Sequence, residues 1–180
     1  MSDERIPRRL LVLKDALELE RRGHAFYLQA AEATKDPRGK NMFLTLARDE
    51  LDHLKFLDEA FRSLMQGGTW PKMPDPAKVA PRQSPRRPEV FASPKQAAAE
   101  VKPSAGELDA LKRGMEAEED SIALYGQALA RAASDDEKRL FGALVAVEEG
   151  HRAILQAEYD HITRTGFWFD FQEFNLESAG

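Results

Sequence analysis

Apolar residues recur at steps of three and four positions along two long stretches of the chain, which is the spacing of a helix with one buried face. In the first stretch this pattern predicts a helix over about 10–34. Asp36 and Pro37 then supply an N-cap and a first-turn proline for a second helix, which runs to about Gln66. Gly67 and Gly68 follow directly and end it.

The second stretch repeats this organisation with clearer start signals. Ser104 and Ser134 each stand three residues before a glutamate, the spacing of a capping box. They predict a third helix over about 104–133 and a fourth over about 135–165.

A proline-rich segment separates the two helix pairs. Eight of the ten prolines lie between Pro71 and Pro103, so this segment cannot be a regular helix and is long enough to cross the length of a bundle. Short links within the pairs and one long crossover between them predict a single all-α domain, a ferritin-like four-helix bundle. Its expected parts are the helix pair 10–66, the crossover 67–103, the helix pair 104–165 and an aromatic tail 166–180.

The two helix pairs are also related in sequence. A shift of 98 residues without gaps gives 14 identities over the 49 positions from 13 to 61, which indicates an internal repeat. Its chemically important pairs are Glu20 with Glu118, Tyr27 with Tyr125, Glu50 with Glu148 and His53 with His151.

The repeat predicts a metal centre. Each Glu-x-x-His pair lies on one face of its helix, and each pair is accompanied by one glutamate on the apolar stripe of the neighbouring helix. The candidate ligands are Glu20, Glu50, His53, Glu118, Glu148 and His151. Four buried carboxylates require compensating charge, and two divalent cations would supply it. We expect two iron ions, with manganese or zinc compatible with the same donors.

The expected roles follow the same symmetry. Glu20 with His53 would hold one ion, Glu118 with His151 the other, and Glu50 and Glu148 would bridge them. Neighbouring carboxylates leave the register open at three places: Asp49 beside Glu50, Glu149 beside Glu148, and Glu116 and Glu119 beside Glu118. The 98-residue shift selects Glu50 and Glu148. Glu116 also has a repeat partner in Glu18, but position on the stripe favours Glu118.

Other polar and aromatic residues near these positions receive different predictions. Tyr27 and Tyr125 lie two turns after the single glutamates, either as core aromatics or as hydroxyls that bond a ligand or lie on the path of an oxidant. His24 and His161 are expected outside the site. The side chains expected on the solvated face of the second helix are Arg48, Asp49 and Asp52.

Composition narrows the possible functions. The chain has no cysteine, which excludes thiolate metal sites within it, and its net charge of −5 argues against a nucleic-acid binder. No apolar run is long enough for a signal peptide or a membrane span, so a cytoplasmic location without membrane contact is expected. Five aromatic residues within 167–174 predict that the tail folds over the bundle or a neighbouring subunit, or docks on another partner.

The segments at residues 20–27, 118–125 and 147–151 resemble the rubrerythrin branch of the ferritin-like superfamily. The resemblance implies that the six residues above are di-iron ligands. Rubrerythrins carry a rubredoxin module for electron supply, which needs cysteines that this chain lacks. They also have a further glutamate one turn after the third-helix ligand, where this chain has Ser121.

Several functions fit this site. The favoured hypothesis is a rubrerythrin-like peroxidase or oxidase, which reduces hydrogen peroxide or dioxygen with electrons from a separate donor protein and serves in oxidative stress. The alternatives are a ferroxidase that handles iron, a metal-stabilised scaffold that binds a partner through its aromatic tail, a di-iron hydroxylase and a dimanganese catalase. A homodimer is expected, with the helix pairs closed within one chain or exchanged between two.

Overall fold

The computed structural model describes residues 8–71 and 102–169. Within these residues the chain forms four long α-helices and the predicted all-α bundle. They are α1 (Arg8–Ala33), α2 (Pro37–Met65), α4 (Ala105–Ala130) and α5 (Asp135–Thr165). No helix in the described ranges is long and apolar enough to cross a bilayer. Most of the predicted crossover (residues 72–101) and the end of the tail (170–180) lie outside the described residues.

The helix starts agree closely with the sequence signals. The Asp36 carboxylate accepts the Arg38 backbone N–H at 2.8 Å, and both serine capping boxes form. The largest difference is at the end of α4, which stops at Ala130 instead of Ala133. There the Glu137 carboxylate accepts the backbone N–H groups of Ala133 and Ser134, so these residues cap α5 and cannot extend α4.

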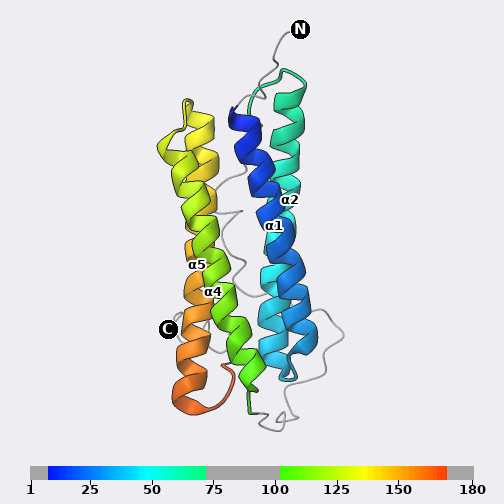
Figure 1. Ribbon diagram of the computed structural model, residues 1–180, viewed down its shortest axis with the longest axis vertical. Helices are drawn as coiled ribbons and strands as arrows, with labels where there is room; N and C mark the ends of the chain where they lie inside the picture. Colours follow the sequence, from blue (N-terminus) through cyan, green and yellow to red (C-terminus); the bar gives the residue numbers. More distant parts are fainter. Residues whose placement is uncertain (1–7, 72–101, 170–180) are drawn as a thin grey trace, which may run out of the picture.

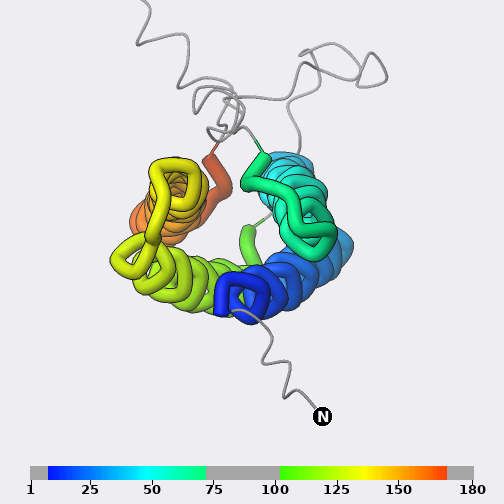
Figure 2. The backbone as a smooth tube through the Cα atoms, turned by 90° about the horizontal axis from the view of Figure 1, so that it is seen from above, coloured from blue at the N-terminus to red at the C-terminus, as the bar shows by residue number. Residues whose placement is uncertain are grey.

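The helices pack as two antiparallel pairs, α1 with α2 and α4 with α5 (Figure 1). The pairs meet along α1 and α4, which lie next to each other when the bundle is seen along its axis (Figure 2). The end of α2 and the start of α4 lie at opposite ends of the bundle (Figure 1). This is the ferritin-like topology expected from the long crossover.

Two apolar clusters occupy the two ends of the bundle. One contains Leu13 of α1, Leu57 of α2 and Leu144 of α5, and the other contains Leu46 of α2 and Leu155 of α5. In all four helices the predicted ligands fall between the residues of these clusters. The candidate site therefore lies in the middle of the bundle with apolar packing on both sides of it.

The first residues of the aromatic tail fold back on the bundle. The Trp168 indole is 1% exposed and lies beside Gly39 and the Phe43 ring of α2. Trp70, exactly 98 residues earlier in the chain, contacts the Phe141 ring of α5 in the same edge-to-face manner. The structural repeat therefore extends past the second helix of each pair, and each tryptophan packs on the other pair.

A buried carboxyl group holds the tail in place. Glu158 of α5 accepts the Phe169 backbone N–H at 2.7 Å, and its second oxygen makes no hydrogen bond within the described residues. Burial raises the pKa of Glu158 to about 7, although the Phe169 hydrogen bond opposes this shift. The folded protein therefore keeps a proton on Glu158 at a pH where an exposed glutamate has lost it.

This proton predicts a pH dependence of stability. A raised carboxyl pKa stabilises the folded state fully below pH 4.5, the ordinary value, and this contribution is lost as the pH rises through about 7. Chemical unfolding of metal-free protein from pH 4.5 to 8 should show a decline of up to about 3 kcal/mol that Glu158→Gln removes. The exposed Glu149→Gln is the matched control and should keep the wild-type slope. Equal slopes for wild type and Glu158→Gln would contradict the assignment.

Candidate metal centre

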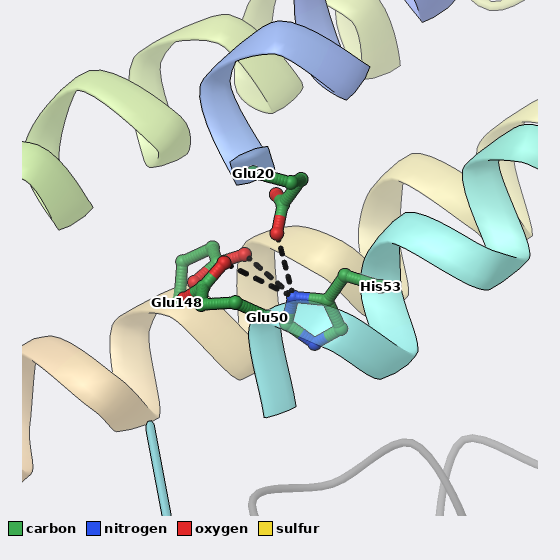
Figure 3. A group of neighbouring side chains, drawn as sticks. All are labelled: Glu20, Glu50, His53 and Glu148. Atoms are coloured by element: carbon green, nitrogen blue, oxygen red, sulfur yellow. Dashed lines mark hydrogen bonds and ion pairs between the residues drawn. The ribbon is translucent and has the colours of Figure 1, made fainter. Parts of the chain in front are cut away.

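All six predicted ligands come together in the middle of the bundle. Each is buried, with at most 4% exposure. They form two overlapping groups whose donor atoms lie within 4.8 Å of one another: Glu20, Glu50, His53 and Glu148 in one, and Glu50, Glu118, Glu148 and His151 in the other. Figure 3 shows the first group, with Glu20 from α1, Glu50 and His53 from α2 and Glu148 from α5. All four helices of a single chain contribute to the two groups.

The two shared glutamates have the orientation of bridging ligands. Glu148 directs Oε1 to His53 Nδ1 at 3.3 Å and Oε2 to His151 Nδ1 at 3.1 Å. Glu50 directs Oε2 to His53 Nδ1 at 3.9 Å and Oε1 to His151 Nδ1 at 3.4 Å. Each carboxylate thus offers one oxygen to each histidine, as a bridge between two ions requires.

The single glutamates each face one histidine, as the repeat predicted. Glu20 Oε2 lies 3.1 Å from His53 Nδ1, and Glu118 Oε1 lies 3.8 Å from His151 Nδ1. The two imidazole rings are 5.7 Å apart and nearly parallel. Both histidines therefore present Nδ1 to the carboxylates, a choice of nitrogen that the sequence could not indicate.

The two tyrosines hold the single glutamates across the helix pairs. The Tyr27 hydroxyl of α1 donates to Glu118 of α4, and the Tyr125 hydroxyl of α4 donates to Glu20 of α1. Burial, followed by the charges of nearby glutamates, raises the pKa of both tyrosines well above the usual value. They remain neutral donors, which agrees with the alternative that their hydroxyls bond candidate ligands.

The prediction that Asp49 lies on the solvated face of α2 is wrong. The residue is buried, and its Oδ2 lies 3.4 Å from His151 Nε2. Its repeat partner is Val147, so the shift that found the other residues could not find Asp49. Arg48 is exposed as expected, and Asp52 lies at the half-exposed edge, where it accepts a hydrogen bond from Lys55.

The two remaining histidines lie outside both groups. His24 Nδ1 is 2.6 Å from the Ala47 carbonyl oxygen, so it ties α1 to α2. The His161 ring packs on the Phe169 ring near the end of α5. Both positions agree with the prediction that neither belongs to the site.

The carboxylates and histidines strongly perturb one another. Burial raises the pKa of Glu50, and the charges of Glu148 and Glu20 raise it further. Burial and the charge of Glu148 likewise raise the pKa of Glu118. Burial would also raise the pKa of Glu148, but the histidine hydrogen bonds and charges outweigh it and lower this pKa below the usual range.

The histidine pKa values move in the opposite direction from that expected of buried imidazoles. Burial alone would lower the pKa of His53, but hydrogen bonds and charges of Glu148 and Glu20 raise it well above the usual value. The pKa of His151 is raised in the same way, by hydrogen bonds to Asp49, Glu148 and Glu50. Since imidazoles bind metals only when the donor nitrogen is free of its proton, metal binding at this site must release protons.

The donor set fits two divalent ions. Glu148 Oε1 is buried and makes no hydrogen bond within the described residues, so this oxygen is available for a metal. Oxygen and imidazole donors in this ratio suit iron or manganese, and they can also bind zinc. The two overlapping groups are consistent with a di-metal centre.

Asp49 is expected to support metal binding without being a ligand. A carboxylate on the distal nitrogen of a ligating histidine orients the ring, and its loss typically costs about 10- to 100-fold in metal affinity. We therefore expect Asp49→Asn to weaken metal binding by about 10-fold or more in calorimetric titrations. Asp52→Asn, one turn away on the same helix, should bind like wild type. Equal affinities for the two variants would contradict this role of Asp49.

A bundle of four helices around two carboxylate–histidine groups with shared glutamates defines the ferritin-like class of di-metal proteins. Within this class, the rubrerythrin family model matches residues 12–159, so the chain belongs to the rubrerythrin family. A comparison with curated protein sequences gives no significant match.

A solved structure shares this fold. It is a hypothetical protein from Pyrococcus furiosus, with a TM-score of 0.64 and 23% sequence identity. The match covers 87% of this chain and 91% of the Pyrococcus chain. At this identity the similarity establishes the bundle architecture, and the assignment of the site depends on the residues described above.

Proposed function

We propose that this protein is a non-haem di-iron oxidoreductase that reduces hydrogen peroxide or dioxygen with electrons from a separate donor protein. The observation that carries the proposal is the orientation of Glu50 and Glu148, which each direct one oxygen to His53 and the other to His151. Two ions held so close together can act on one small molecule in a concerted way.

In this proposal Glu20 and His53 would hold one iron ion, and Glu118 and His151 would hold the other. When bound, the two ions would supply one electron each, which together with two protons convert one hydrogen peroxide into two water molecules. We assign re-reduction to a separate donor protein, and the 180 residues themselves contain no cysteine for a rubredoxin-type iron site.

The residues around the site hold the candidate ligands in position and limit the access of water to them. Tyr27 and Tyr125 fix the orientation of Glu118 and Glu20 through their hydroxyl hydrogens. The apolar clusters at the two ends of the bundle close the site to bulk water along the bundle axis. In this low-dielectric setting, charges around the reacting molecule interact more strongly than they would in water.

Anaerobic single-turnover measurements test the proposal. Iron-loaded, chemically reduced protein is expected to consume about one hydrogen peroxide per two iron ions, with the near-ultraviolet absorption of the oxidised di-iron form rising at the same time. A reduced spectrum that persists in the presence of peroxide would contradict a peroxidase function. Iron analysis separates the ferroxidase alternative, because a storage protein would retain far more iron per chain than the two ions that the site can hold.

A further inference from the structure

A cavity opens between α1 and α4 beside the metal centre. Its volume is about 210 Å³, and its inner wall includes the side chains of Glu50, Glu118 and Tyr27. Within the described residues, this cavity therefore brings open space at the α1–α4 contact up to two candidate ligands. Gly23 lines it from α1 and Ser121 lines it from α4.

Gly23 lines the cavity directly beside Glu50. A Cβ atom built at position 23 would lie 3.4 Å from both Cδ and Oε2 of Glu50, which is ordinary contact distance, so any side chain at this position would lie against that carboxylate. A glycine within a helix costs about 1 kcal/mol relative to alanine, and no positive φ angle requires one here. Its repeat partner Ser121 faces the same cavity from α4 and is also small.

The cavity is not symmetric with respect to the repeat. It reaches Tyr27 and Glu118, whereas their repeat partners Tyr125 and Glu20 do not line it. A molecule in the cavity therefore meets the group formed by Glu118 and His151 before the group formed by Glu20 and His53.

Both charged and apolar side chains line the cavity. Arg22, Arg113 and Asp120 are exposed lining residues, and the Arg113 guanidinium lies 5.4 Å from the centre of the Phe26 ring. Phe26 and Leu19 are partly buried and contribute apolar surface to the lining. A cavity of about 210 Å³ suits a small neutral molecule or a small monoanion better than a bulky organic one.

We propose that this opening is the entry route for the oxidant, that Gly23 sets its size limit, and that an entering molecule arrives first beside Glu118 and Glu50. The identity of the entering molecule as an oxidant rests on the function proposed above. The route itself applies to any small molecule that binds the loaded centre, so it can be tested without turnover.

Azide binding to cobalt(II)-loaded protein provides this test, because the visible bands of cobalt(II) change when an external ligand binds. Gly23→Leu places a branched side chain in the cavity, and we expect it to slow azide association by about 10-fold or more in stopped-flow measurements. Azide dissociation should slow in parallel, because a narrowed passage acts in both directions. Gly23→Ala should have a smaller effect than Gly23→Leu.

Two further variants make the test specific. Ser121→Leu narrows the opposite wall and should also slow azide association, which keeps the test possible if Gly23→Leu fails to fold. Gly126→Leu is the matched control, since a Cβ at this α4 glycine meets nothing within 4 Å and the residue does not line the cavity. It should bind azide at the wild-type rate.

The outcomes separate the entry route from the redox function. Wild-type azide rates in both Gly23→Leu and Ser121→Leu, with full cobalt content, would overturn the route, as would an equal slowing in Gly126→Leu. Loss of azide affinity without a change in the association rate would overturn it too, because that points to a distorted site. If the iron centre of the wild-type protein does not react with peroxide, the proposed oxidoreductase function is wrong. The azide comparison would still test the entry route, because it does not depend on turnover.

Discussion

Replacing both proposed bridging residues, Glu50→Gln with Glu148→Gln, is expected to abolish binding of the metal pair while the protein stays folded. Glutamine preserves side-chain volume but removes two of the four negative charges that would balance two divalent ions. Since loss of a residue that merely supports a ligand costs about 10- to 100-fold in affinity, loss of both bridges should exceed about 100-fold. Metal analysis after gel filtration measures the effect directly.

Thermal unfolding separates a ligand role from a structural one in the same variant. Wild-type protein should gain stability on addition of iron(II), manganese(II) or cobalt(II), because only the folded state presents the assembled site. The double glutamine variant should lose this response. Without metal it should remain folded but be less stable than wild type, since both histidines lose the Glu148 carboxylate as a buried ionic partner.

Glu149 is the matched control for this experiment. It directly follows Glu148 but is exposed, and Glu149→Gln should retain both metal ions and the metal-dependent rise in melting temperature. If the double variant still binds two ions with wild-type affinity, Glu50 and Glu148 are not bridging ligands. A double variant that unfolds even without metal would indicate a structural role for the two carboxylates instead.

Trp168→Ala is expected to cause the largest loss of stability outside the metal centre. The indole is 1% exposed and packs against Gly39 and the Phe43 ring of α2. Truncation of a buried aromatic side chain to alanine costs about 3–5 kcal/mol, which urea unfolding of metal-free protein can measure. Trp70→Ala is the matched comparison, because Trp70 occupies the repeat-related position and is only half-buried. Its truncation should lower the free energy of unfolding clearly less than Trp168→Ala does.

Gly39 provides an independent check on the same contact. A Cβ at position 39 would lie 2.6 Å from the Trp168 ring, so Gly39→Ala should destabilise wild-type protein. In a Trp168→Ala background the same change should be close to neutral, because the ring that it displaces is gone. Additive effects of the two substitutions would contradict direct packing of Trp168 on Gly39.

Much of the architecture was predictable because it depends on neighbours in the sequence. Helical periodicity and the capping boxes at Ser104 and Ser134 are local signals, and they placed the helix starts almost correctly. The internal repeat selected Glu50 and Glu148 among adjacent carboxylates, since two copies of one motif must occupy equivalent positions in a twofold-related bundle.

The repeat could not reveal features that differ between its two copies. Asp49 corresponds to Val147, so nothing in the sequence distinguished its buried carboxylate from the exposed ones around it. Gly23 and Ser121 are repeat partners, yet the cavity between them reaches Glu118 and not its repeat partner Glu20. These differences arise from how the helices rotate and approach one another.

Local sequence signals and the internal repeat were therefore enough to predict the helices, their pairing order and the six residues that meet at the centre. Only the packed bundle showed that Nδ1 of each histidine faces the carboxylates, that Tyr27 and Tyr125 cross between pairs, and that Trp168 packs on α2. Helical phase, which a sequence reveals, restricts a side chain only to one face of its helix. Contacts between helices also depend on axial offset, rotation and side-chain rotamer, which only packing of the whole bundle sets.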